Sequence, residues 1–281
     1  MPSADGALPL RHAAMLGLLQ GPTELLPVSS SAHTTLIPWL AGWQYARLDG
    51  ERRKSFEVAL HAGAGAALAI HMRSELLRDA ARLDRRRAGV IALALAPPAL
   101  AGYALGPAIE RALGGPRSIA AGLAGGAVAM AIADRRAPGA GHGSRAQEQA
   151  SARDGLALGL AQAAALIPGV SRNGATLTAA RARGFDRRAA QALSWHAGLP
   201  VIFGASVLKG ARMRRTGVPR GQRAALAVGG AAAFLSTLAS ARLLDRRLRD
   251  DQPLWSYSLY RCLLAALVVS RLRDRDTANA D

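Results

Sequence analysis

Two short polar segments of the chain carry side chains suited to phosphoryl chemistry. Residues 20–33 read Gln-Gly-Pro-Thr-Glu-Leu-Leu-Pro-Val-Ser-Ser-Ser-Ala-His, which includes a carboxylate, Glu24, and an imidazole, His33. Residues 168–176 read Pro-Gly-Val-Ser-Arg-Asn-Gly-Ala-Thr, which includes a guanidinium, Arg172. Together they offer a nucleophile, a proton acceptor and a cation for phosphate oxygens. Both segments interrupt apolar stretches, where polar groups are expensive and are kept mainly for function.

The surrounding apolar stretches predict a membrane protein. Half of the 281 residues are apolar, and charge is concentrated between the apolar blocks. A soluble, alanine-rich helical protein is the alternative, but six blocks with little interior charge are hard to bury in water. Each block is near the roughly 20 residues that a spanning helix needs, some on the short side. The expected spans are Ser55–Met72, Ala88–Gly106, Ile119–Ala133, Ala189–Leu208, Ala224–Leu244 and Trp255–Ser270.

The net charge of +17 comes almost entirely from arginine, since Lys54 and Lys209 are the only lysines. Nucleic-acid binding is the obvious interpretation of such a charge. The basic residues, however, cluster in short loops between apolar blocks, as in polytopic proteins that contact anionic lipid headgroups. We therefore expect membrane lipids, and no nucleic acid, as partners. Basic residues crowd most of the loops, so charge bias alone does not fix the orientation in the membrane.

The two polar segments lie in stretches that resemble each other. When residues 16–34 are set against residues 158–176, an offset of 142, the register places Ser30 opposite Arg172. His61-Ala62-Gly63 is echoed by His196-Ala197-Gly198. We expect a single membrane domain, 1–281, of two inverted repeats at about 8–136 and 152–272, followed by a polar tail at 273–281. The identical pairs are Leu16/Leu158, Gly17/Gly159, Leu18/Leu160, Gln20/Gln162, Val28/Val170, Ser29/Ser171 and Thr34/Thr176.

Each polar segment also has the pattern of a broken helix. Leu8–Leu19 and Leu156–Leu166 are apolar but short, and each is followed by proline, glycine or serine and then by a second apolar piece. A short helix, an irregular tip and a short helix make a re-entrant hairpin, which is tolerated only where its tip is buried in protein or lines a wet cavity. The sequence therefore predicts an all-α membrane fold with about six spanning helices and two re-entrant helical hairpins, whose tips build one cavity.

Each candidate side chain also has a structural interpretation. Glu24 could be neutralised by an arginine, the serines of residues 29–31 could cap the next helix, and His33 could be a hydrogen-bonded packing residue. Glu24 and Gln20 would share a helical face, although Pro22 leaves the local geometry open. For three further histidines in apolar helices we favour interhelical hydrogen bonds over chemistry: His61, His71 and His196.

At these motifs the chain resembles the undecaprenyl-diphosphate phosphatase family, the bacitracin-resistance membrane enzymes. Residues 20–33 are similar to its signature Glu/Gln-Gly-x-Thr-Glu-x-Leu-Pro-(Ile/Val)-Ser-Ser-(Ser/Thr)-Gly-His, and residues 168–176 to its Pro-Gly-x-Ser-Arg-Ser-Gly-Ala-Thr. Further echoes are Phe56-Glu57-Val58, Leu199-Pro200 and Tyr260-Arg261. The resemblance covers nearly the whole chain in order.

The resemblance implies hydrolysis of undecaprenyl diphosphate to the monophosphate carrier used in cell-wall synthesis. It implies a multi-pass protein of the bacterial plasma membrane, with the site towards the extracytoplasmic face, and a divalent cation, Mg²⁺ or Ca²⁺. By the same resemblance, Ser30 is the nucleophile or a phosphate-contacting hydroxyl, Glu24 the activating carboxylate or a metal ligand, His33 a proton-transfer group and Arg172 the diphosphate-binding group. The motif does not decide whether Ser30 or His33 attacks phosphorus.

The site expected from the resemblance is larger than these four residues. Gln20 stands where many members of the family have Glu, so its role as a second metal ligand beside Glu24 is open, and Ala32 and Asn173 replace Gly and Ser. Substrate contacts are expected at Ser29, Ser31, Ser171, Asn173, Gly174 and Thr176.

Two other classes of function compete with the phosphatase. A transporter or flippase of a polyprenyl phosphate lipid would also use broken helices that meet at the membrane midplane. A membrane scaffold would tolerate alanine throughout both polar segments. The oligomeric state is open, with a homodimer among the options.

Overall fold

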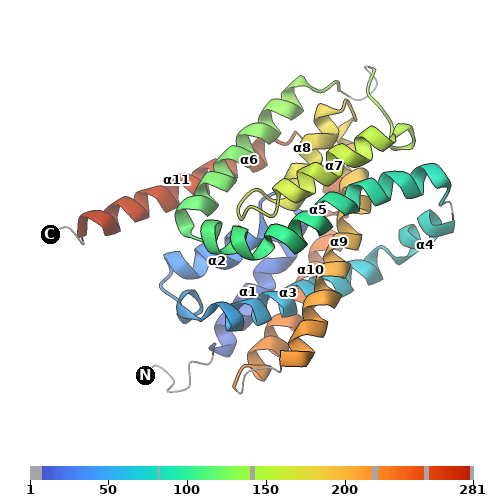
Figure 1. The fold of residues 1–281 in the computed structure, drawn as a ribbon. Helices are drawn as coiled ribbons and strands as arrows, with labels where there is room; N and C mark the ends of the chain where they lie inside the picture. Colours follow the sequence, from blue (N-terminus) through green and yellow to red (C-terminus); the bar gives the residue numbers. More distant parts are fainter. Residues whose placement is uncertain (1–7, 82, 140–142, 217–220, 250–252, 279–281) are drawn as a thin grey trace. The chain divides into compact units, whose positions relative to one another are not determined.

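The computed structural model describes residues 8–81, 83–139, 143–216, 221–249 and 253–278, and over these ranges the protein is helical with no strand (Figure 1). This confirms the predicted all-α class. Two 3₁₀ turns, at Gln44–Arg47 and Gln147–Gln149, accompany the α-helices. The helices are α1 (Leu10–Leu25), α2 (Ser30–Leu40), α3 (Gly50–His71), α4 (Arg73–Ala81), α5 (Arg85–Leu113), α6 (Pro116–Arg136), α7 (Ala152–Ala164), α8 (Arg172–Ala182), α9 (Arg187–Thr216), α10 (Arg223–Arg249) and α11 (Trp255–Ala278).

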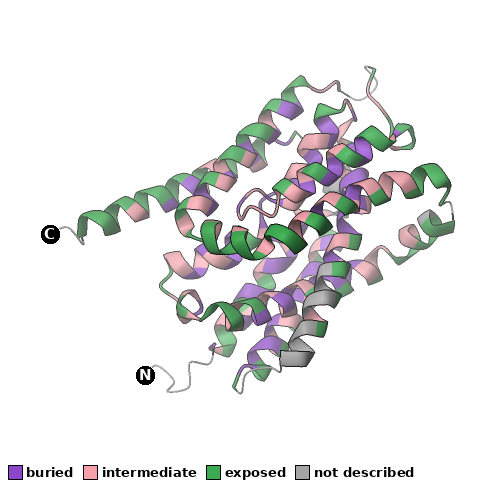
Figure 2. Ribbon diagram, viewed as in Figure 1, coloured by how far each residue is buried: buried purple, intermediate pink, exposed green. Residues whose placement is uncertain are grey.

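Within the described ranges, three helices are long and apolar enough to cross a membrane: residues 85–113, 116–136 and 223–244. They contain three of the six predicted spans. The other three predicted spans lie in α3, α9 and α11, except that Ser55–Met72 ends one residue beyond α3, and their crossing of the membrane stays a prediction. Figure 2 shows exposed residues along α5, where Leu100 and Tyr103 are 69% and 90% exposed. A spanning helix with such a face is suited to contact with lipid.

Both predicted broken helices are present as pairs of short helices. In the first pair, α1 and α2 are separated by residues 26–29, and in the second, α7 and α8 are separated by residues 165–171. The second pair packs together, with α5 against α7 and α6 against α8. We call residues 26–29 and 165–171 the first and second tips. Re-entry of the pairs into a membrane and the boundaries of the two repeats stay predictions.

The chain forms two compact units, each assembled from separate stretches of sequence. The first contains residues up to 25, residues 33–82 and residues 202–245, and the second contains residues 26–32, 83–201 and 246–281. The core of the first unit includes Leu16, Phe56 and Leu60. That of the second includes Leu158, Leu177, Phe185 and Leu193.

In the second unit, two buried carboxylates, Asp134 and Asp154, form ion pairs and hydrogen bonds that connect helix ends near α7 and α8. Asp134, at the end of α6, accepts hydrogen bonds from Arg181 Nε and Arg187 Nε, each at 2.9 Å, and from the Leu254 N–H at 3.0 Å. Arg181 is itself 2% exposed and donates further to the carbonyls of Pro138 and Phe185. One ion-paired network thus joins the ends of α6, α8, α9 and α11.

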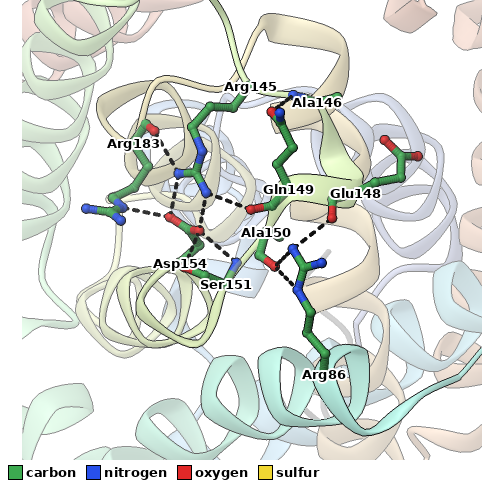
Figure 3. Close-up of polar contacts among 9 residues, drawn as sticks. All are labelled: Arg86, Arg145, Ala146, Glu148, Gln149, Ala150, Ser151, Asp154 and Arg183. Atoms are coloured by element: carbon green, nitrogen blue, oxygen red, sulfur yellow. Dashed lines mark hydrogen bonds and ion pairs between the residues drawn. The ribbon is translucent and has the colours of Figure 1, made fainter.

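The second carboxylate, Asp154 in the first turn of α7, organises the segment that precedes it (Figure 3). Arg145 donates two hydrogen bonds to it at 2.9 and 2.7 Å, and Arg183 donates one at 2.7 Å. Arg86 of α5 holds the Glu148 and Ala150 carbonyls at 2.7–3.1 Å. The described part of the glycine- and alanine-rich stretch before α7 is therefore tied to helices of its own unit.

Candidate active site

Glu24 and Gln20 share one face of α1, as their spacing predicts, because the helix continues through Pro22 to Leu25. Gln20 Nε2 donates to Glu24 Oε2 at 3.1 Å, and both side chains are buried. A proline inside a helix removes the N–H that would bond to the carbonyl four residues earlier. Here that carbonyl is Leu18, and the Ser236 hydroxyl of α10 donates to it instead. This hydroxyl donor explains why α1 continues past Pro22, a point that the sequence left open.

His61 of α3 lies beside the same carboxylate. Its Nε2 is 3.9 Å from Glu24 Oε2, and its Nδ1 donates to the Glu57 carbonyl at 2.8 Å. The prediction of an interhelical hydrogen bond for His61 was therefore wrong in its partner, since this bond lies within α3. The interhelical contact is a potential ion pair, charged only when the imidazole is protonated. His196 of α9 shares the contact within its own helix, with Nδ1 2.6 Å from the Ala192 carbonyl, and the same nitrogen lies 3.3 Å from Gln147 Nε2.

Ser29 and Ser171 occupy the same unusual backbone position in the two tips. Their φ angles are +75° and +69°, and they are the only residues other than glycine with positive φ in the described ranges. Each side chain caps the helix that follows: the Ala32 N–H donates to Ser29 Oγ at 3.4 Å, and the Gly174 N–H donates to Ser171 Oγ at 3.1 Å. The capping interpretation is thus confirmed for one serine of the first segment, and the tips share a local geometry at the predicted offset of 142.

The remaining candidates of the first segment lie in the first turn of α2. Ser30 begins the helix and is half-buried, Ser31 is exposed, and His33 is 2% exposed. The Ser29 and Ser31 hydroxyl oxygens are 3.3 Å apart. A helix N-terminus presents unpaired N–H groups and a positive dipole end, so the position of Ser30 favours an anion.

Arg172 occupies the corresponding position in the second tip, as the first residue of α8, and is half-buried. Its guanidinium lies against Gly198 of α9. A Cβ built on Gly198 would be 1.7 Å from Arg172 Nη1, a distance that no pair of atoms tolerates. The absence of a side chain at Gly198 therefore provides the space that the guanidinium occupies.

Behind Arg172, Asn173 and Thr176 join a buried hydrogen-bonded cluster. The Ser194 hydroxyl of α9 donates to Asn173 Oδ1 at 2.8 Å, and its oxygen is 2.5 Å from Thr176 Oγ1. Thr176 is fully buried and also donates to the Arg172 carbonyl at 2.9 Å. These bonds position the first turn of α8. A direct contact of Asn173 or Thr176 with a substrate stays a prediction.

Arg261 of α11 joins the two tips. Its guanidinium is fully buried and donates to the Pro27 carbonyl of the first tip at 3.4 Å and to the Gly169 and Val170 carbonyls of the second at 3.1 and 2.7 Å. All four residues belong to the second unit. The backbones that precede Ser30 and Arg172 are thus held by one side chain. A cavity shared by Ser30 and Arg172 stays a prediction, and this contact favours it.

A divalent cation fits the surroundings of Glu24. No cluster of three His, Cys, Asp or Glu side chains occurs among the described residues. Gln20, however, is fully buried, and its Oε1 has no hydrogen-bond partner. Next to a carboxylate, an unused amide oxygen is the kind of ligand that Mg²⁺ and Ca²⁺ take. Glu24 and Gln20 therefore lie together, and the Gln20 Oε1 acceptor is unused; ligation of a metal by the pair stays a prediction.

Sequence reasoning missed three residues that shape this region. An arginine inside an apolar helix is a functional signal in itself. That signal could have identified Arg261, which was considered only as part of the Tyr260-Arg261 echo. Ser194 and Gly198 lie two residues on either side of His196 in an apolar helix. Nothing in their own types indicates contact with the second tip, which depends on the packing of α9 beside α8.

Comparison with known proteins shows which family and which sequences the chain resembles. A model of the family described as bacitracin resistance protein BacA matches residues 13–267. A protein named undecaprenyl-diphosphatase from Geobacter sulfurreducens is 37% identical over 275 residues, covering 94% of this chain and 98% of that protein. Proteins of the same name from Trichlorobacter lovleyi and Idiomarina loihiensis are 36% and 32% identical, with 90% and 92% of this chain covered. The similarity spans both tips and the helices that carry them.

Proposed function

Because the chain belongs to the bacitracin resistance protein BacA family, we propose that it is an undecaprenyl-diphosphate phosphatase, which releases inorganic phosphate and regenerates undecaprenyl phosphate. The observation that supports this most directly is the pair of tips joined by Arg261. Each tip ends in a capped helix N-terminus, one opening with Ser30 and the other with Arg172. Two such termini and a guanidinium suit a diphosphate.

The chemistry follows from the residue types. Arg172 binds phosphate oxygens with its planar fork. Ser30 or His33 attacks the terminal phosphorus, with Glu24 as the activating carboxylate, and the bond to the bridging oxygen breaks. Undecaprenyl phosphate leaves with the electron pair of that bond. Water then attacks the phosphoryl group held by the nucleophile, the bond from that residue to phosphorus breaks, and inorganic phosphate is released with the oxygen of the water. Positioning and charge stabilisation supply most of the catalysis that a phosphoryl transfer requires.

A divalent cation would be held by Glu24 and Gln20 and would offset the charge of the diphosphate. The protein works in the bacterial plasma membrane, with its site towards the extracytoplasmic face. The apolar helices would contact the isoprenoid chain and the membrane lipids. A transporter or flippase of a polyprenyl phosphate remains the second candidate class, but the family relationship does not favour it.

The direct test is release of phosphate from undecaprenyl diphosphate by the purified protein in detergent, with and without a chelator. Transport alone liberates no phosphate, so a protein that releases none under any cation is not a phosphatase. In the same assay, Arg172→Lys should lose most of the activity, because a point charge does not replace a bidentate fork. Turnover near wild type in this variant would remove Arg172 from its role.

A further inference from the structure

The imidazole of His61 and the carboxylate of Glu24 face each other within the first unit. Nε2 of His61 is the nearer nitrogen, 3.9 Å from Glu24 Oε2, while Nδ1 is bonded to the Glu57 carbonyl at 2.8 Å. A carbonyl oxygen only accepts hydrogen bonds, so Nδ1 carries the hydrogen, and a neutral ring has its lone pair on Nε2. Two electron-rich groups are therefore close together in a region where Glu24 is buried.

Gln20 adds a third group. Its amide nitrogen is 3.1 Å from the same Glu24 oxygen, and its amide oxygen is buried without a partner. Turning the amide by half a turn exchanges nitrogen and oxygen with little change in shape, and the two assignments differ only in the hydrogen bonds they make. In the turned state the amide oxygen and the imidazole nitrogen both adjoin the same carboxylate oxygen, Glu24 Oε2, an arrangement that a cation would stabilise.

We propose that His61 is a third protein ligand, with Glu24 and Gln20, of the divalent cation in the proposed function, and that it makes the site select Mn²⁺ over Mg²⁺ and Ca²⁺. A histidine that binds a metal almost always donates its other ring N–H, often to a backbone carbonyl, as His61 does to Glu57. Imidazole suits transition metals, while carboxylate and carbonyl oxygens suit Mg²⁺, Ca²⁺ and Mn²⁺ alike. Of these three ions, Mn²⁺ is the only transition metal, so it is the one that gains most from an added imidazole ligand.

The distances allow one ion to be shared. Neighbouring ligands of an octahedral ion with bonds of about 2.1 Å lie roughly 3 Å apart. The separation of 3.1 Å between the Gln20 amide and Glu24 already matches. The 3.9 Å separation to His61 is longer, and ligation requires a rotation that shortens it, in a side chain that is 34% exposed. Three protein ligands leave the other positions to water and to phosphate oxygens of the substrate, as is common in phosphoryl-transfer sites.

The test measures cation binding to the purified full-length protein without substrate. Mn²⁺ binding is followed by electron paramagnetic resonance, and electron spin echo modulation of bound Mn²⁺ reports a coordinated imidazole nitrogen. Wild type should show the nitrogen modulation and prefer Mn²⁺ to Mg²⁺ in competition. His61→Gln should lose the modulation and weaken Mn²⁺ binding by about tenfold or more, since even the loss of an outer-shell partner costs 10–100-fold. His61→Ala serves as a second variant.

His196→Gln is the matched control, because His196 makes the same bond to a carbonyl four residues earlier in its helix. It should keep both the modulation and the preference for Mn²⁺. The inference is overturned if the modulation survives in both His61 variants, if it disappears only in His33→Gln, or if wild type binds no Mn²⁺. Phosphate release with Mg²⁺ tests the proposed function separately: activity without an imidazole signal refutes the His61 ligand alone, and an imidazole signal without activity under any cation refutes the phosphatase alone.

Discussion

The guanidinium of Arg261 donates to the carbonyl of Val170 at 2.7 Å, directly before the serine that caps α8. The same side chain reaches the Pro27 carbonyl in the first tip, two residues before the serine that caps α2. Gly126 of α6 and Gly174 of α8 leave the space that this guanidinium fills, since a Cβ on either would lie within 2.8 Å of its nitrogens. One side chain thus sets the spacing of both helix N-termini.

Arg261→Lys should therefore impair catalysis more than it impairs folding. An ammonium has three donors on a flexible stem and does not hold three carbonyls in the fixed geometry of a guanidinium. We expect kcat for phosphate release to fall by tenfold or more, about 1.4 kcal/mol, with a smaller change in KM, because misplaced tips still bind substrate. Arg273→Lys, at an exposed position of the same helix, should match wild type. A loss of thermal stability with full activity per folded molecule would make Arg261 a structural residue only.

Gly198→Ala should displace Arg172 without touching it chemically. The new methyl group occupies the position of Nη1, so the guanidinium must turn away from its present place. Phosphate release should fall towards the level of Arg172→Lys. Gly204→Ala in the same helix is the control, because a Cβ there meets nothing within 4 Å. It should leave activity unchanged and stabilise the helix by up to about 1 kcal/mol. A fully active Gly198→Ala variant would show that the guanidinium has room elsewhere.

The two left-handed serines provide a test of stability. At Ser29 and Ser171, glycine adopts the positive φ without strain. Replacing a serine cap by glycine costs only a few tenths of a kcal/mol. Alanine keeps the strain and loses the cap, which costs about 1 kcal/mol. Thermal unfolding in detergent should therefore rank glycine near wild type and alanine below both at each position. If alanine and glycine variants unfold at the same temperature, the cap and the backbone strain do not govern these positions.

Asp154 should make the stability of the protein depend on acid pH. Burial raises the pKa of this carboxyl, but hydrogen bonds from Arg145, Arg183 and Ser151 outweigh it and hold the pKa well below the usual range. Because the folded pKa lies below the unfolded value of about 4, the stabilisation is complete above that value and is lost as pH falls through the folded pKa. Compared with Asp154→Asn, wild type should be more stable at neutral pH, with a gap that narrows below about pH 4. A gap that is constant from pH 7 to 3 would contradict this assignment.

The local features of the fold could be predicted from the sequence, and the partners of the site could not. Apolar lengths and the proline, glycine and serine signals predicted both broken helices, because those signals act within a few residues. The pairing of Ser29 with Ser171 at an offset of 142 marked two matching positions, and the structure gives them the same backbone conformation. The neighbours of Glu24 and Arg172 on other helices, His61 and Gly198, depend on helix packing, which one sequence does not reveal.

Pro22 illustrates the same limit at the level of one bond. The sequence left this turn of α1 open because proline removes a helical hydrogen bond. In the structure, the Ser236 hydroxyl of α10, more than 200 residues away in sequence, donates to the Leu18 carbonyl that would otherwise lack a donor. No periodicity or motif connects these two positions. The substitution of one donor for another is visible only once α1 and α10 are placed together in the first unit.

This borrowed hydrogen bond makes Pro22 and Ser236 energetically interdependent. At the membrane depth predicted for α1, the Leu18 carbonyl would find no water to replace a lost donor, so the loss of that hydrogen bond would cost its full free energy. Restoring the backbone N–H with alanine at position 22 would make the serine hydroxyl redundant. The Ser236 hydroxyl thus stabilises α1 only while position 22 is proline. This constrains the order in which substitutions at the two positions could occur. A chain that lost the hydroxyl first would pass through a less stable state, whereas one that lost the proline first would not.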